Sequence, residues 1–111
     1  MNKISVFLAD DHTMLRDGLK SILHKNDGIE VIGEAGDGLE AVKKIKAIRP
    51  DVCIIDISMP RIKGIDVIRM AKEAAPNMKI VVLTMHDKEE YIYQALKNGA
   101  SGYVLKSSSS E

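Results

Sequence analysis

The sequence lacks several features that would point to a special environment. It has one cysteine among 111 residues, Cys53, so no internal disulfide can form, and the surrounding apolar run predicts a small buried side chain. No apolar run approaches the roughly 20 residues of a membrane span, and the first residues lead directly into a short apolar run rather than a secretory signal. The 16 basic and 16 acidic side chains cancel, so no overall field attracts nucleic acid or a membrane. We therefore expect one domain over residues 1–111, located in the cytoplasm.

Short apolar runs alternate with longer stretches of helical period. The apolar runs predict strands over 4–9, 29–35, 51–55, 79–83 and 103–105. The periodic stretches predict helices with their apolar faces over 14–23, 41–48, 67–75 and 92–96. Pro50 and the Asn98-Gly99 pair end two of these helices. Regular strand–helix alternation predicts the α/β class, with a parallel sheet covered by helices on both faces.

Polar residues of related chemistry follow four of the predicted strands. Asp10-Asp11 follows the first, Asp56 the third, Thr84 the fourth and Lys106 the fifth. Ligands of open parallel sheets bind beyond the carboxyl ends of the strands, where these side chains would converge. Three carboxylates, a hydroxyl and an ammonium form a site for a divalent cation and a phosphoryl group.

Each of these residues also has a plain structural interpretation. Asp10-Asp11 alone is more often a helix cap, Thr84 alone is another cap, and Lys106 alone is a surface lysine. Their occurrence together, each at the end of a separate strand, favours the functional interpretation. The three histidines lack the spacing of a zinc site, and we interpret them as surface or capping residues: His12, His24 and His86.

The motifs in this order resemble the receiver domain of bacterial two-component response regulators. The resemblance rests on Asp10-Asp11, on 56–60 (Asp-Ile-Ser-Met-Pro) with Gly64, on Thr84, and on 99–106 (Gly-Ala-Ser-Gly-Tyr-Val-Leu-Lys). Residues 11–19 and 84–86 are similar more narrowly to the LuxR/NarL-type subgroup, in which a helix-turn-helix DNA-binding domain follows the receiver. The resemblance implies a flavodoxin-like, doubly wound five-stranded sheet of order 2-1-3-4-5.

The resemblance also assigns the chemistry of the site. It implies that Asp56 is the phosphoryl acceptor, taking its group from the phosphohistidine of a sensor kinase. It implies that Mg²⁺ or Mn²⁺ is bound by Asp10, Asp11 and Asp56 with the backbone carbonyl of Ser58. Lys106 and Thr84 would hold further phosphoryl oxygens, and Ser58 and His86 would flank the site and tune hydrolysis.

The expected activity is a signalling switch that catalyses its own phosphorylation and dephosphorylation, not a turnover enzyme. On phosphorylation Thr84 would move inward and the ring of Tyr103 would rotate into the vacated space, biasing a pre-existing equilibrium that controls a DNA-binding output domain in transcription regulation. The chain stops where a fifth helix would begin, so we expect a receiver truncated before that helix and before its DNA-binding domain. The face left open beside Met14, Leu15 and Leu19 is expected to allow a homodimer.

Two other functions and one local choice stay open at this stage. Phosphatases of the haloacid dehalogenase class also use an aspartate nucleophile with Mg²⁺, but they carry an Asp-x-Asp motif after the first strand. A receiver-like module could also act purely as a protein-binding domain, although such modules lack part of the acidic cluster or the lysine.

Many receivers have proline after the lysine, in a cis bond, whereas Ser107 follows Lys106 here. A cis bond without proline costs about 3–4 kcal/mol, so the bond is either trans with a different loop or strained.

Overall fold

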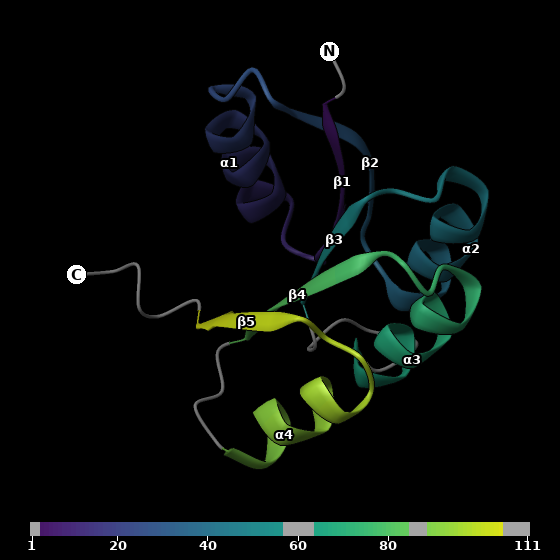
Figure 1. Cartoon of the computed structure of the whole chain (residues 1–111). Coiled ribbons are helices and arrows are strands. Elements are labelled where there is room, and N and C mark those ends of the chain that lie inside the picture. The colour runs from purple at the N-terminus through teal and green to yellow at the C-terminus, as the bar shows by residue number, and fades with distance from the viewer. Residues whose placement is uncertain (1–2, 57–63, 85–88, 106–111) are drawn as a thin grey trace.

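The computed structural model describes residues 3–56, 64–84 and 89–105, which form five strands and four helices (Figure 1). The strands are β1 (Ile4–Ala9), β2 (Ile29–Ala35), β3 (Val52–Asp56), β4 (Lys79–Thr84) and β5 (Gly102–Leu105). The helices are α1 (Thr13–His24), α2 (Gly38–Ile48), α3 (Gly64–Ala74) and α4 (Glu89–Lys97). The predicted breaks are confirmed, since α2 ends two residues before Pro50 and α4 ends at the residue before Asn98-Gly99.

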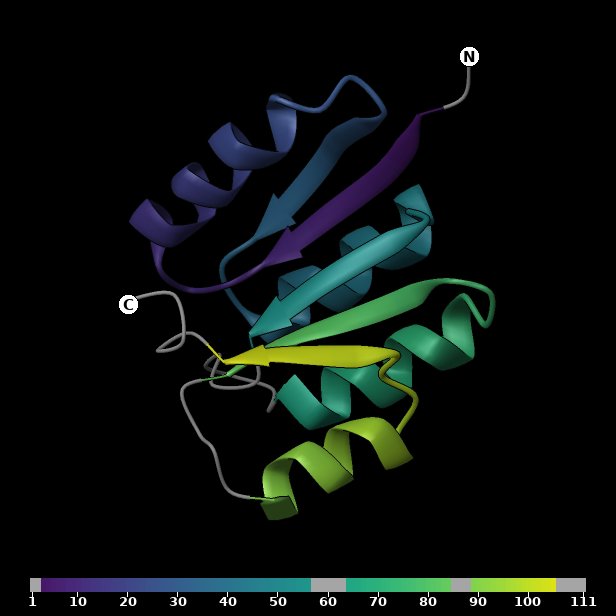
Figure 2. The same cartoon turned by 60° about the vertical axis from the view of Figure 1, so that its left-hand side comes forward.

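All neighbouring strands pair in parallel, in the order β2-β1-β3-β4-β5. This order confirms the flavodoxin-like doubly wound sheet. Helix α1 lies on one face of the sheet, and α2, α3 and α4 lie on the other (Figures 1 and 2). Within the described ranges, no helix combines the length and the apolar character needed to cross a bilayer.

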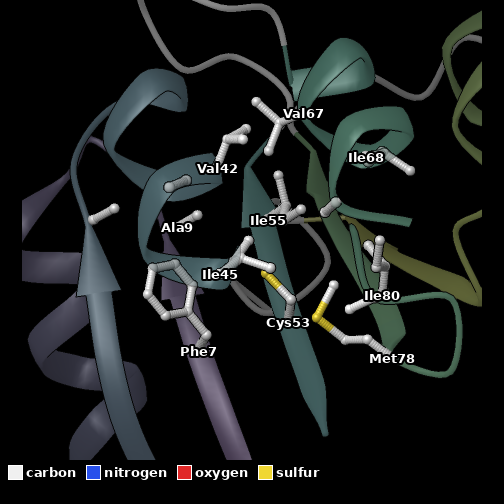
Figure 3. Packing of buried hydrophobic residues seen from close by; sticks show 14 of the residues in the cluster. Phe7, Ala9, Val42, Ile45, Cys53, Ile55, Val67, Ile68, Met78 and Ile80 are labelled. Carbon is white, nitrogen blue, oxygen red and sulfur yellow. The ribbon is translucent and has the colours of Figure 1, made fainter. Parts of the chain in front are cut away.

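The main core lies between the sheet and helices α2 to α4. Alternate residues of each strand point to this side, as the two-residue period of a strand requires. They include Phe7 and Ala9 of β1, Cys53 and Ile55 of β3, and Ile80 of β4, all at most 1% exposed (Figure 3). Cys53 is fully buried, which confirms the prediction, and burial raises the pKa of its thiol. The core-facing side chains of the central strands are therefore buried up to the carboxyl edge of the sheet.

Helix α1 is attached differently from the other helices. None of its residues is buried; Met14 is 88% exposed, whereas Leu15 and Leu19 are half-buried, so the apolar strip expected beside these three residues is open only at Met14. Polar contacts join it to β2 instead, because Glu34 accepts a hydrogen bond of 2.7 Å from Lys20 and forms an ion pair of 3.1 Å with Arg16. Association of two copies through the strip stays a prediction.

Strand β2 carries a bulge beside the first strand. The pairing runs from Ile4–Ile29 to Val6–Val31, then continues at Phe7–Gly33, which leaves Ile32 as an extra residue. A Cβ placed on Gly33 would lie 3.0 Å from the ring of Phe7. Glycine at this position lets the strand approach the largest buried side chain.

We expect Gly99→Ala to destabilise the domain by about 1–3 kcal/mol. Gly99 has a φ of +118°, which alanine adopts only with strain, and an added Cβ would lie 2.7 Å from Cγ of Lys72. Lys72 has little freedom to move because its ammonium donates hydrogen bonds of 2.9 Å to the carbonyls of Pro76 and Met78. Urea unfolding followed by circular dichroism measures the change.

Gly18→Ala is the matched control. Gly18 lies in the interior of α1, and an added Cβ would have no atom within 4 Å. Alanine in a helix interior is favoured over glycine by about 0.5–1 kcal/mol, so this variant should become more stable. If both variants changed stability in the same direction, the strain argument for Gly99 would be wrong.

Candidate functional site

Two aspartates meet at the carboxyl edge of the sheet. Asp56 is the last residue of β3, and Asp10 directly follows β1, whose Ala9 pairs with Ile55. The backbone N–H of Asp10 donates to the carbonyl of Ala35, which holds this turn against β2. Asp10 is 1% exposed and Asp56 is fully buried. Carboxylates buried this deeply have lost their hydration and need a nearby positive charge or strong donors.

The next two residues complete a cluster of four side chains. The Nδ1 atom of His12 lies 3.0 Å from Oδ1 of Asp10 and 3.1 Å from Oδ1 of Asp11. The same nitrogen lies 3.9 Å from Oδ2 of Asp56. Asp11 and His12 are the open side of the cluster, with 33% and 62% of their side chains exposed. Two buried carboxylates therefore form the floor of a site that is reached from solvent past Asp11 and His12.

The donor set fits a small divalent cation. Each of the four residues offers one ligand atom, and these atoms all lie within 4.8 Å of one another. Two carboxylates 4 Å apart repel by about 4 kcal/mol at an effective dielectric constant of 20, so a cation between them is strongly favoured. Carboxylate oxygens are the ligands that Mg²⁺ and Mn²⁺ prefer. The acidic cluster that the sequence predicted is therefore present, and Asp10, Asp11 and Asp56 are the residues that could hold the ion.

A hydrogen bond from α1 supports the loop that carries the cluster. The guanidinium of Arg16 donates 2.9 Å to the carbonyl of Asp10, and the Arg16 side chain is only 16% exposed. Because the same side chain also pairs with Glu34 of β2, it ties the Asp10 turn to both a helix and a strand. Arg16 therefore supports the loop that carries the acidic cluster through the Asp10 carbonyl.

The remaining predicted residues are placed only in part. Thr84 is the last residue of β4 and follows Leu83, the residue that pairs with Asp56. The side chain of Thr84 lies outside the described residues. Tyr103 lies in β5, pairs with Val82 of β4 and is 44% exposed. Ser58, His86 and the Lys106–Ser107 bond also lie outside the described residues. The roles proposed for these residues stay predictions.

Sequence reasoning missed His12 and Arg16. The prediction that His12 is a surface or capping residue is right for its backbone, which is at the N-cap of α1, and for its exposure. It is incomplete for the side chain, which faces the acidic cluster rather than capping the helix. The only signal in the sequence was that His12 directly follows the Asp10-Asp11 pair.

Comparison with known proteins places this geometry in a family. Residues 6–111 match the sequence profile of the response regulator receiver domain. The chain is 41% identical to the transcriptional regulatory protein DegU of Brevibacillus brevis, over 95% of this chain and 44% of DegU. It spans about half the length of the curated relatives it matches.

Solved structures give the same result. The signal receiver domain of the response regulator NarL from Mycobacterium tuberculosis superimposes with a TM-score of 0.90 at 35% identity, covering 96% of this chain and 86% of that domain. A chain of the CheX–CheY complex with BeF₃⁻ and Mg²⁺ from Borrelia burgdorferi superimposes with a TM-score of 0.89 at 28% identity, covering 95% and 79%. With five parallel strands and an acidic cluster at their carboxyl edge, the chain belongs to the response regulator receiver domain family, and several of its relatives are of the NarL/LuxR type.

Proposed function

We propose that this chain is a phosphorylation-controlled signalling switch in which Asp56 accepts a phosphoryl group from the phosphohistidine of a sensor kinase. The observation that carries the proposal is the burial of Asp56 at the end of a central strand, with carboxylate oxygens of Asp10 and Asp11 inside the same 4.8 Å cluster. A related CheY chain was solved in a complex with Mg²⁺ and BeF₃⁻, which supports the same ion here.

The chemistry requires alignment and charge neutralisation more than new covalent groups. A carboxylate oxygen of Asp56 attacks phosphorus; an O–P bond forms, and the P–N bond to the kinase histidine breaks with its electron pair going to nitrogen. Asp10 and Asp11 would hold Mg²⁺ or Mn²⁺ with Asp56 and the carbonyl of Ser58. When bound, the ion neutralises charge on the carboxylates and on the transferring group. We assign two further phosphoryl oxygens to the Thr84 hydroxyl and the Lys106 ammonium.

The signalling step is proposed to pass from Thr84 to Tyr103. Both belong to neighbouring strands at the edge of the sheet, and Tyr103 has an aromatic side chain that is half exposed. Phosphorylation would bias an equilibrium between two arrangements of this edge. In the whole protein the readout would be a DNA-binding domain that regulates transcription, as the name of the relative DegU indicates for that protein. We place this signalling in the cytoplasm, with a sensor histidine kinase as partner.

The first test is phosphorylation of the wild-type chain by a small acyl-phosphate donor. Intact mass spectrometry should show the addition of one phosphoryl group with Mg²⁺ or Mn²⁺ and no addition with excess EDTA. The label should be released by hydroxylamine, because an acyl phosphate is cleaved by that nucleophile and a phosphoserine is not. A label that forms in EDTA, or that resists hydroxylamine, would contradict the proposal.

A further inference from the structure

The peptide unit between Asp10 and Asp11 joins two of the residues that are proposed to bind the ion. Its carbonyl accepts a hydrogen bond of 2.9 Å from Nη1 of Arg16. The preceding peptide unit is also held, because the N–H of Asp10 donates 3.0 Å to the carbonyl of Ala35. A peptide unit is planar, so fixing its carbonyl also fixes the direction in which the chain continues to Asp11. The bond from Arg16 therefore limits how far the Asp11 carboxylate can move relative to that of Asp10.

Asp11 is the carboxylate whose position depends most on this support. Asp10 and Asp56 are buried against the sheet, whereas 33% of the Asp11 side chain is exposed, in the turn between β1 and α1. A more exposed side chain has more conformational freedom to lose when it binds an ion. Holding the backbone of Asp11 in advance reduces this cost and so favours binding.

The guanidinium of Arg16 is itself confined on two sides. Its Nε lies 3.1 Å from Oε1 of Glu34 in β2. This contact is an ion pair without hydrogen-bond geometry, since the buried Nε has no hydrogen-bond partner among the described residues. On the other side, a Cβ added to Gly36 would lie 3.0 Å from Nη1. Glu34 and the space beside Gly36 therefore leave the guanidinium directed at the Asp10 carbonyl.

We propose that Arg16 is a positioning residue that sets the affinity of the acidic cluster for Mg²⁺ by fixing the Asp10–Asp11 peptide. This inference rests on the metal-binding part of the proposed function. Groups that orient metal ligands typically change metal affinity by about 10–100-fold. A purely electrostatic role predicts the opposite sign, because the positive charge of Arg16 repels a cation and its removal would strengthen Mg²⁺ binding.

Calorimetric titration with Mg²⁺ tests the proposal. In Arg16→Met, which keeps an aliphatic side chain and lacks the donor, the dissociation constant should rise about tenfold or more. Lys20→Met is the matched control, because Lys20 also joins α1 to Glu34, through a hydrogen bond of 2.7 Å. Both substitutions remove a positive charge and a link between helix and strand, but the affinity of Lys20→Met should stay close to that of the wild type. Equal losses in both variants would show that Arg16 only attaches the helix, and would overturn the inference.

Nuclear magnetic resonance of the metal-free chain gives a readout that does not depend on the ion. The amide of Asp11 shares its peptide plane with the Asp10 carbonyl, so its ¹⁵N order parameter reports the mobility of this unit. It should fall from about 0.85, the value of a rigid backbone, toward about 0.6 in Arg16→Met. It should stay at the wild-type value in Lys20→Met. An Asp11 amide that is equally rigid in Arg16→Met would contradict the proposal.

Gly36→Ala decides the question if Arg16→Met does not fold. The added Cβ would displace the guanidinium and leave every charge in place, so Mg²⁺ binding should again weaken. Unchanged or tighter Mg²⁺ binding in the folded variant would overturn the inference. If the wild type binds Mg²⁺ and forms the hydroxylamine-sensitive label while loss of the Arg16 contact has no effect, the inference fails and the proposed function stands. If the wild type neither binds Mg²⁺ nor forms the label, both fail.

Discussion

Asp56→Asn is expected to abolish phosphoryl uptake completely. The amide has the same shape as the carboxylate but lacks the anionic oxygen that attacks phosphorus, so no acyl phosphate can form at this position. The substitution also removes a charge from the acidic cluster, which is proposed to bind Mg²⁺. Magnesium at a hundred times its dissociation constant stabilises a folded protein by about 2.7 kcal/mol, and the variant should show a clearly smaller gain at the same concentration. Intact mass and urea unfolding with and without Mg²⁺ measure the two effects.

Asp51→Asn is the matched control at the other end of the same strand. Asp51 directly precedes β3, and its carboxylate accepts a hydrogen bond of 2.9 Å from the backbone of Ser5. It lies outside the acidic cluster, so labelling and the response to Mg²⁺ should stay at wild-type levels. Equal labelling of the wild type and Asp56→Asn would refute the assignment of the acceptor.

Phe7→Ala is expected to remove about 3–5 kcal/mol of stability, which is a large part of the roughly 5–15 kcal/mol that holds a small domain folded. Phe7 is the chain's only phenylalanine and is fully buried between β1 and the inner face of α2, with Ile45 beside it (Figure 3). Deleting its ring leaves a cavity at the point where β2 approaches through Gly33. The unfolding midpoint in urea should fall sharply, and part of the sample should be unfolded without denaturant.

Tyr93→Ala is the control for loss of an aromatic ring. Tyr93 is 61% exposed on α4, with the ammonium of Lys97 6.0 Å from its ring centre. Its removal should change stability by about 0.5 kcal/mol or less. Phe7→Leu, which keeps most of the buried volume, should fall between the two alanine variants. Similar losses for Phe7→Ala and Tyr93→Ala would show that the core is not organised around Phe7.

The parts of this molecule that local patterns determine could be predicted from the sequence. Alternating apolar runs placed the strands, and the rule that ligands bind beyond the carboxyl ends of parallel strands placed Asp10 and Asp56 together. Both follow from periodicity, because a strand pairing in parallel brings its last residue beside the last residue of its neighbour. The order of the strands came from resemblance rather than from the residues themselves.

The parts that depend on contacts between distant residues could not be predicted in this way. The ring of His12 lies near the carboxylate of Asp56, although the two residues are 44 positions apart in the sequence. No motif in the sequence predicts this proximity. Arg16 and Lys20 reach Glu34 for the same reason, although each looks like an ordinary surface residue of a helix or strand. The helical period of α1 predicted an apolar inner face, yet no residue of this helix is buried.

The extra residue at Ile32 changes which side of the sheet the end of β2 presents. If Ile32 were paired and the register that begins at Ile4–Ile29 continued without interruption, Glu34 would lie opposite Ala9, on the side of the apolar core. With it, Glu34 pairs with Leu8 and faces α1, and Ala35 enters the core in its place. One extra residue thus reverses which face of the sheet each following side chain of β2 occupies, because the strand period is two residues. Because Glu34 pairs with Arg16, which also donates to the carbonyl of Asp10, the irregular pairing of β2 and the position of the loop beside the acidic cluster depend on each other.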